Sequence, residues 1–218
     1  MKKILSLAVS AWFIAILGLV AGPVSGKTFQ EGTQYVPIQP QPPVSTGEQV
    51  EVVEFFWYGC PHCRDFEPVV LRWAAGLPSN VRFTQIPVMF GGAADLHAQV
   101  YYALEGMGEL KRLNSKIFDE MHVNKNKLRT REAVDAFLEK NDVDMKKFSE
   151  AMNSFAVAAK VNRARALMRR YGIRSVPAMV VDGRYRSGTG FSSYQEITEV
   201  MDHVVDKVLT QRKTQAGL

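Results

Sequence analysis

Residues 50–63, with the sequence VEVVEFFWYGCPHC, decide the fold of this chain. Val50 to Phe56 is a nearly continuous apolar run broken by two acids, a pattern typical of a buried central strand. Gly59 ends this strand. From Cys60 to about Ala75 the apolar residues recur at helical spacing, so a helix follows directly. We therefore expect Cys60 to lie at a junction between a strand and a helix.

Further strands accompany the central one. Val81 to Val88 alternates well enough to form a second strand, which completes a β-α-β unit. Near the end of the chain, Ala178–Val181 and Arg184–Arg186 flank the pair Asp182-Gly183, which has the composition of a two-residue hairpin loop. A short edge strand is expected around Tyr35–Ile38, followed by an extended connector rich in Pro, Gln and Ser.

A run of helices without any strand signal separates the β-α-β unit from the hairpin. The residues Thr130, Asp144 and Ser154 are suited to cap three of these helices, and Gly172 is suited to end the last. This arrangement predicts an α/β fold with a helical insertion of roughly eighty residues. The expected helices lie near 95–106, 109–121, 131–140, 145–153 and 155–171.

A final helix carries the clearest pattern in the chain. Ser193 and Glu196 have the spacing of a capping box. One apolar face is formed by Ile197, Val200, Met201, Val204, Val205, Val208 and Leu209. The expected organisation is a discontinuous domain of residues 27–90 and 172–210, the helical insertion at 91–171, and a frayed polar tail at 211–218.

The first 26 residues have the features of a secretory signal peptide. Lys2 and Lys3 precede an uncharged apolar run from Ile4 to Ala21, and small residues follow it, so cleavage is expected before Lys27. An uncleaved membrane anchor is the alternative, because the run approaches the length that spans a bilayer. The formal net charge of +5 includes two charges from this segment, and so mild an excess does not call for nucleic acid.

The chain has only two cysteines, and they are three residues apart. A disulfide that closes so short a loop removes little entropy from the unfolded chain, so a purely structural role is a poor explanation for the pair. At the start of a helix, unpaired N–H groups and the helix dipole favour the Cys60 thiolate. Pro61 suits the first helical position, and His62 adds a donor beside the sulfur. Stabilisation of the thiolate favours the reduced form, which is the property of an oxidant.

A zinc site is the competing interpretation of a Cys-X-X-Cys pair. It needs four ligands, and the remaining candidates are His97, His122 and His203, which lack ligand spacing. We therefore expect no metal and interpret these histidines as solvated or satisfied helix residues.

The segment from Glu54 to Cys63 resembles the active-site region of the DsbA family of periplasmic dithiol oxidases. Residues 175–185, with the sequence SVPAMVVDGRY, look like the cis-proline loop and hairpin of that family. The resemblance implies a thioredoxin-like fold with an inserted helical domain. It also implies that Pro177 is cis and faces the cysteines, where the backbone of Val176 hydrogen-bonds a substrate strand.

Glu54 corresponds to the family's buried acid beneath the cysteines, which shuttles a proton for Cys63. A surface carboxylate at a strand end is the alternative. Where some members carry a lysine beside this acid, the present chain has Gln85, which makes Glu54 harder to ionise. The residues expected around the site, if they are not simply core, are Trp57, Tyr58, Phe90 and Met179. A solvated helix face is expected for Arg163, Arg165, Arg169 and Arg170.

The resemblance implies an exported, monomeric enzyme without a cofactor that donates its Cys60–Cys63 disulfide to unfolded proteins in the periplasm. It implies reoxidation by a DsbB-like, quinone-linked membrane partner. A reductase or isomerase of the same fold is the nearest alternative, and a non-catalytic holdase is a second.

Overall fold

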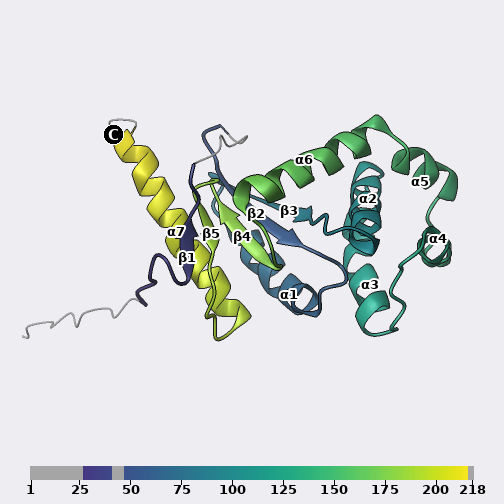
Figure 1. Cartoon of the computed structure of the whole chain (residues 1–218), viewed down its shortest axis with the longest axis horizontal. Helices are drawn as coiled ribbons and strands as arrows, with labels where there is room; N and C mark the ends of the chain where they lie inside the picture. The colour runs from purple at the N-terminus through teal and green to yellow at the C-terminus, as the bar shows by residue number, and fades with distance from the viewer. Residues whose placement is uncertain (1–26, 41–46, 216–218) are drawn as a thin grey trace, which may run out of the picture.

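The centre of the molecule is a five-stranded sheet with the strand order β1-β5-β4-β2-β3 (Figure 1). The computed structural model describes residues 27–40 and 47–215, so the predicted signal segment and part of the connector lie outside the described residues. β2 and β3 are parallel, and every other neighbouring pair is antiparallel. The strands are β1 (Tyr35–Pro37), β2 (Val50–Phe56), β3 (Val81–Pro87), β4 (Ala178–Val181) and β5 (Tyr185–Ser187).

All seven residues of β2 are buried, which explains its nearly continuous apolar sequence. Val50 and Val52 belong to the core on one face of the sheet, together with Phe66 of the following helix. Val53 and Phe55 belong to the core on the opposite face. Because side chains alternate along a strand, Glu54 lies on the same face as Val52, beneath that helix.

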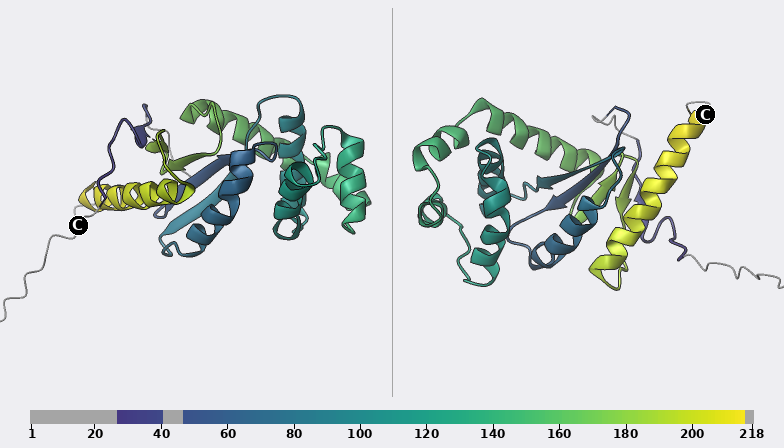
Figure 2. Two further views of the ribbon diagram at one scale, coloured as in Figure 1. Left: turned by 90° about the horizontal axis from the view of Figure 1, so that it is seen from below. Right: turned by 180° about the vertical axis from the view of Figure 1, so that it is seen from behind.

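Helices cover both faces of the sheet (Figure 2). α1 (Pro61–Ala75) and α7 (Tyr194–Gln215) lie side by side on one face, whereas α6 (Phe155–Tyr171) runs along the other. The remaining helices gather at the end of the molecule farthest from α7 (Figure 1). They are α2 (Ala93–Gly106), α3 (Leu110–His122), α4 (Arg131–Lys140) and α5 (Met145–Met152). Within 27–40 and 47–215, no helix combines the length and apolar character needed to cross a membrane.

The predicted positions of α1 and of the five helices of the insertion are confirmed to within two residues. Thr130, Asp144 and Ser154 each accept a hydrogen bond from the backbone N–H three residues later, so all three cap their helices as expected. Gly172 ends α6 with φ +64°, a left-handed conformation that glycine adopts at little cost. These features are local, which is why a sequence pattern reveals them.

The hairpin and the start of the last helix differ in detail from the prediction. Asp182 and Gly183 both have positive φ and form the expected turn, but β5 begins at Tyr185, one residue later than predicted. Ser193 accepts from the Glu196 N–H (3.1 Å), as in a capping box. The Glu196 carboxylate, however, accepts from the N–H of Ser192 (2.6 Å) rather than from that of Ser193. The reciprocal half of the capping box is therefore displaced by one residue.

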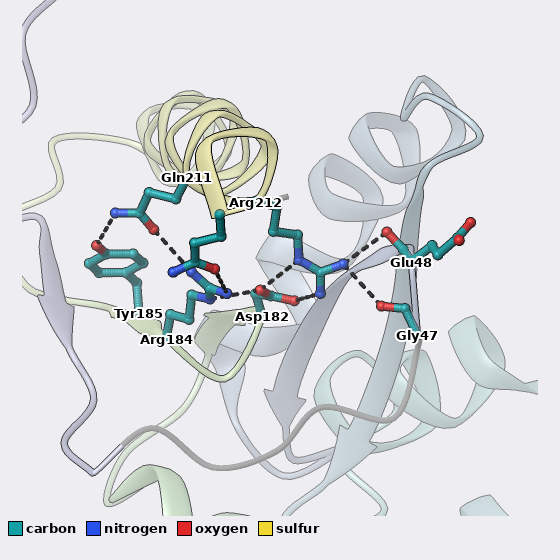
Figure 3. A network of polar contacts seen from close by, with 8 residues as sticks. Gly47, Glu48, Asp182, Arg184, Tyr185, Gln211 and Arg212 are labelled. Atoms are coloured by element: carbon teal, nitrogen blue, oxygen red, sulfur yellow. Dashed lines mark hydrogen bonds and ion pairs between the residues drawn. The ribbon is translucent and has the colours of Figure 1, made fainter. Parts of the chain in front are cut away.

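The prediction of a frayed tail from residue 211 was wrong for residues 211–215, which continue α7. A buried carboxylate at the hairpin turn holds this last turn in place (Figure 3). Arg212 and Arg184 both pair with Asp182, whose side chain is only 1% exposed, and Arg212 also donates to the carbonyls of Gly47 and Glu48. Arg212, which lies in the predicted tail, is therefore a partner of Asp182 and of the segment before β2.

Candidate active site

The two cysteines lie at the start of α1 with different exposure. Cys60 is the N-cap residue with an extended backbone (φ −89°, ψ 118°), and Pro61 occupies the first turn. The Cys60 N–H donates to the carbonyl of Trp57 (3.0 Å), which closes the loop before the helix. Both cysteines are free thiols, with Cys60 at 9% exposure and Cys63 fully buried. A partner can therefore reach the Cys60 sulfur more easily than that of Cys63.

The surroundings of the two sulfurs separate their acidities. The hydrogen bond from the Cys63 thiol, together with the backbone N–H groups of Cys63 and His62, lowers the pKa of Cys60 to about 6. Burial raises the pKa of Cys63 far above its ordinary value, and the neighbouring Cys60 adds to this rise. At neutral pH the pair therefore carries its negative charge on Cys60.

The loop before β4 approaches the cysteines from a distant part of the chain. The peptide bond between Val176 and Pro177 is cis, as the resemblance implied. The Cys60 sulfur lies 3.5 Å from the carbonyl oxygen of Val176, to which its thiol form donates, across a separation of 116 positions. Cys60, Val176 and Pro177 are therefore brought together, as expected for a shared site.

His62 lies on the surface beside an open groove. Its Nδ1 is 3.0 Å from the hydroxyl of Tyr194, the first residue of α7. The groove has an open volume of about 810 Å³ and runs from His62 and Pro177 along residues 187–195, from the end of β5 to the start of α7. Sequence reasoning missed this groove, because its walls come from segments far apart in the chain.

Glu54 lies in a buried polar network beneath the cysteines. Gln85 is its direct neighbour in the register of β2 and β3. The Gln85 amide nitrogen donates to Glu54 Oε2 (2.9 Å) and to Glu67 Oε2 (2.7 Å). Asn114 donates to the other Glu67 oxygen and accepts from the Tyr58 hydroxyl. The predicted surface alternative for Glu54 is thus wrong, since this side chain is fully buried.

Both carboxyls in this network resist ionisation. Burial, with a contribution from Glu67, raises the pKa of Glu54 to about 8, while the hydrogen bond from Gln85 opposes the rise. Burial also raises the pKa of Glu67. Glu54 Oε1 has no hydrogen-bond partner among the described residues. Sequence reasoning missed Glu67, although its position four residues after Cys63 places the two side chains on one face of α1.

Two histidines expected to be satisfied are held by hydrogen bonds. His97 is 2% exposed and contacts Trp57 Nε1 (3.1 Å) and the carbonyl of Leu128 (2.9 Å). His122 Nε2 lies 2.7 Å from the carbonyl of Tyr58. His203 packs against the rings of Phe29 and Tyr35. In the part of the chain that the structure describes, no three His, Cys, Asp or Glu side chains gather at one point to hold a metal ion.

The side chains expected around the site fall into two groups. Tyr58 and Met179 are core residues at 1% and 0% exposure, whereas Phe90 is 47% exposed and Trp57 is half-buried. The arginines of α6 form a largely exposed face, as predicted. Of the four, Arg165 is half-buried and pairs with Asp95 (3.3 Å).

Comparisons with known proteins agree with this geometry. A family model described as a DSBA-like thioredoxin domain matches residues 51–202. The thiol:disulfide interchange protein DsbA of Azotobacter vinelandii is 37% identical over 207 residues, which covers 94% of this chain and 97% of that protein. DsbA of Burkholderia cepacia is 38% identical over 217 residues, covering 95% of this chain and 98% of that protein.

Solved structures show the same likeness. The crystal structure of Pseudomonas aeruginosa DsbA has a TM-score of 0.81 and 36% sequence identity, and the match covers 85% of this chain and 97% of that chain. The oxidoreductase DsbA1 from Neisseria meningitidis has a TM-score of 0.75 and 27% identity, and the match covers 84% of this chain and 96% of that chain.

Proposed function

This chain belongs to the DSBA-like thioredoxin family, and on that premise we propose that it is a thiol:disulfide oxidoreductase that donates its Cys60–Cys63 disulfide to other proteins. The observation that carries the proposal is the asymmetry of the two thiols. Cys60 keeps 9% exposure and has a pKa of about 6, whereas Cys63 is fully buried and hard to ionise. A pair whose reduced form is stabilised in this way is a good oxidant.

The reaction proceeds through a mixed disulfide. A substrate thiolate attacks the Cys60 sulfur of the oxidised enzyme, the Cys60–Cys63 bond breaks, and Cys63 leaves with the electron pair. Because buried Cys63 strongly favours its thiol form, it takes up a proton. A second substrate thiolate then attacks the substrate sulfur of the mixed disulfide, which releases the oxidised substrate and the Cys60 thiolate.

Glu54 is proposed as the source of that proton. Its pKa of about 8 keeps the carboxyl protonated at neutral pH, and it lies close enough to Cys63 to affect its ionisation. Val176 and Pro177 are proposed to receive the substrate backbone opposite Cys60. His62 is proposed to favour the Cys60 thiolate through its charge and its N–H.

The proposal includes an exported enzyme that acts on unfolded proteins in the periplasm and is reoxidised by a DsbB-like membrane protein. It draws support from the predicted signal segment and from the relatives named DsbA.

Two experiments test the proposal. The reduction potential against glutathione should lie well above the value of about −270 mV typical of thioredoxin, and a value close to that would instead favour a reductase. Cys63→Ala should accumulate mixed disulfides through Cys60 that non-reducing gels resolve. Cys60→Ser should accumulate none. Full activity of Cys60→Ser in an assay with reduced proteins would show that the activity does not depend on the cysteine pair, and would favour a non-catalytic holdase instead.

A further inference from the structure

The loop between β2 and α1, residues 57–60, is held by side chains of the helical insertion. Trp57 donates from its indole Nε1 to Nδ1 of His97 on α2 (3.1 Å). The next residue, Tyr58, accepts at its carbonyl from Nε2 of His122 on α3 (2.7 Å). The position of the segment that leads into Cys60 therefore depends on α2 and α3, two helices of the insertion.

His97 is built into this arrangement in one protonation state. Its Nδ1 accepts from Trp57, so its Nε2 carries the hydrogen that is donated to the carbonyl of Leu128 (2.9 Å). Leu128 is buried and has φ +46°, a conformation that non-glycine residues rarely adopt. Both ring nitrogens of a buried side chain are thus committed to fixed partners on two different segments.

Trp57 in turn fixes the backbone at both cysteines. Its indole ring lies directly on Gly59, where an added Cβ would come within 2.3–2.6 Å of three ring atoms. Its carbonyl accepts the N–H of Cys60 (3.0 Å). The backbone N–H of Trp57 is a hydrogen-bond donor to Cys63, and it lowers the pKa of the Cys63 thiol. A shift of the indole would therefore be felt at both sulfurs.

We propose that His97 is a positioning residue of the redox centre, which holds the Trp57 indole in place and thereby fixes the loop that carries Cys60. The inference rests on the proposed function only through the cysteine pair. It assigns to the helical insertion a direct part in the redox properties of that pair.

Two substitutions of His97 separate its two hydrogen bonds. The amide oxygen of His97→Asn can take the place of Nδ1 and accept from Trp57, whereas the amide of His97→Gln reaches the position of Nε2 and keeps only Leu128. We expect His97→Gln to raise the pKa of Cys60 and to shift the glutathione equilibrium toward a weaker oxidant by about fivefold, the size of one net hydrogen bond. His97→Asn should stay close to wild type, as should the control His203→Gln on α7.

Trp57→Phe provides a second, independent arm, because it deletes the indole N–H and keeps an aromatic ring. It should produce the same shift as His97→Gln, and the double variant should shift no further than either one. Thiolate absorbance measures the pKa of Cys60, and equilibration with glutathione measures the redox constant. If His97→Gln does not fold, Trp57→Phe and His97→Asn decide the question.

The proposal is wrong if His97→Gln and Trp57→Phe keep the wild-type Cys60 pKa and glutathione equilibrium, even if both lose stability. It is also wrong if His97→Asn behaves like His97→Gln, because the hydrogen bond to Trp57 would then not be what connects His97 to Cys60. Failure of the proposed function is distinguishable, because the wild-type chain itself would then have the potential of a reductant.

Discussion

Cys60 makes the stability of the reduced protein depend on pH. Its pKa is lowered from an ordinary 9.0 to about 6, so the folded state binds the thiol proton less readily than the unfolded chain. The resulting stabilisation is complete above pH 9, decreases as the pH falls toward 6, and is lost below that value.

Urea denaturation of both redox forms checks this prediction. The unfolding free energy of the reduced protein should fall toward acid relative to that of the oxidised protein, whose disulfide does not titrate. Parallel profiles of the two forms between pH 6 and 9 would contradict the assigned Cys60 pKa.

Gln85 is the residue at which a single substitution should change the proton chemistry. In Gln85→Lys, an ammonium group would lie between the carboxyls of Glu54 and Glu67, which now share one amide nitrogen. Because a nearby positive charge favours a carboxylate, the pKa of Glu54 should fall well below its present value of about 8. Carboxyl ¹³C NMR against pH measures this shift.

Gln85→Leu is the matched control for the lysine variant. It removes the donor without adding charge, so the pKa of Glu54 should not fall, because the Gln85 hydrogen bond is what now opposes its rise. A fall of equal size in both variants would show that disruption of packing, rather than charge, is responsible.

At the scale of elements, the last turn of α7 depends on one buried ion pair. Arg212→Ala leaves the Asp182 carboxylate with Arg184 as its remaining guanidinium partner among the described residues. Loss of one partner from a buried charge network should lower the free energy of unfolding by about 2–3 kcal/mol. Chemical denaturation measures this loss.

Lys213→Ala is the control for Arg212→Ala, since it alters the next residue of the same helix at an exposed position. It should change the unfolding free energy by less than about 0.5 kcal/mol. Equal stabilities of the two variants would mean that the Asp182 network contributes nothing.

Features that depend on neighbouring residues could be predicted from the sequence, and those that depend on packing could not. Val50 to Phe56 reads as a buried strand because both of its faces are covered. Helix caps can be predicted because the capping side chain and the N–H that it accepts from lie three residues apart. Contacts between elements leave no such pattern, because their residues meet only after the fold has formed. Three of them are Asp182–Arg212, Trp57–His97 and His62–Tyr194.

At the scale of the whole molecule, the described N-terminal segment is joined to the sheet through a glycine. A Cβ at Gly188 would lie 1.8 Å from the carbonyl oxygen of Thr33, and the Gly188 N–H donates to the carbonyl of Gln34 (2.8 Å). Gly188→Ala should therefore detach β1 from β5, lower the melting temperature and expose residues near 30–37 to limited proteolysis. Gly106→Ala, whose Cβ would meet open space, should be neutral or slightly stabilising. Equal protease resistance of the two variants would argue against this contact.

The separation of 116 positions between Cys60 and Val176 has a consequence for the order of synthesis. The ribosome releases both cysteines long before it makes the carbonyl that faces them. A growing chain therefore carries two thiols whose site is incomplete, and the pair acquires its full setting only when the hairpin and the final helix have joined the sheet.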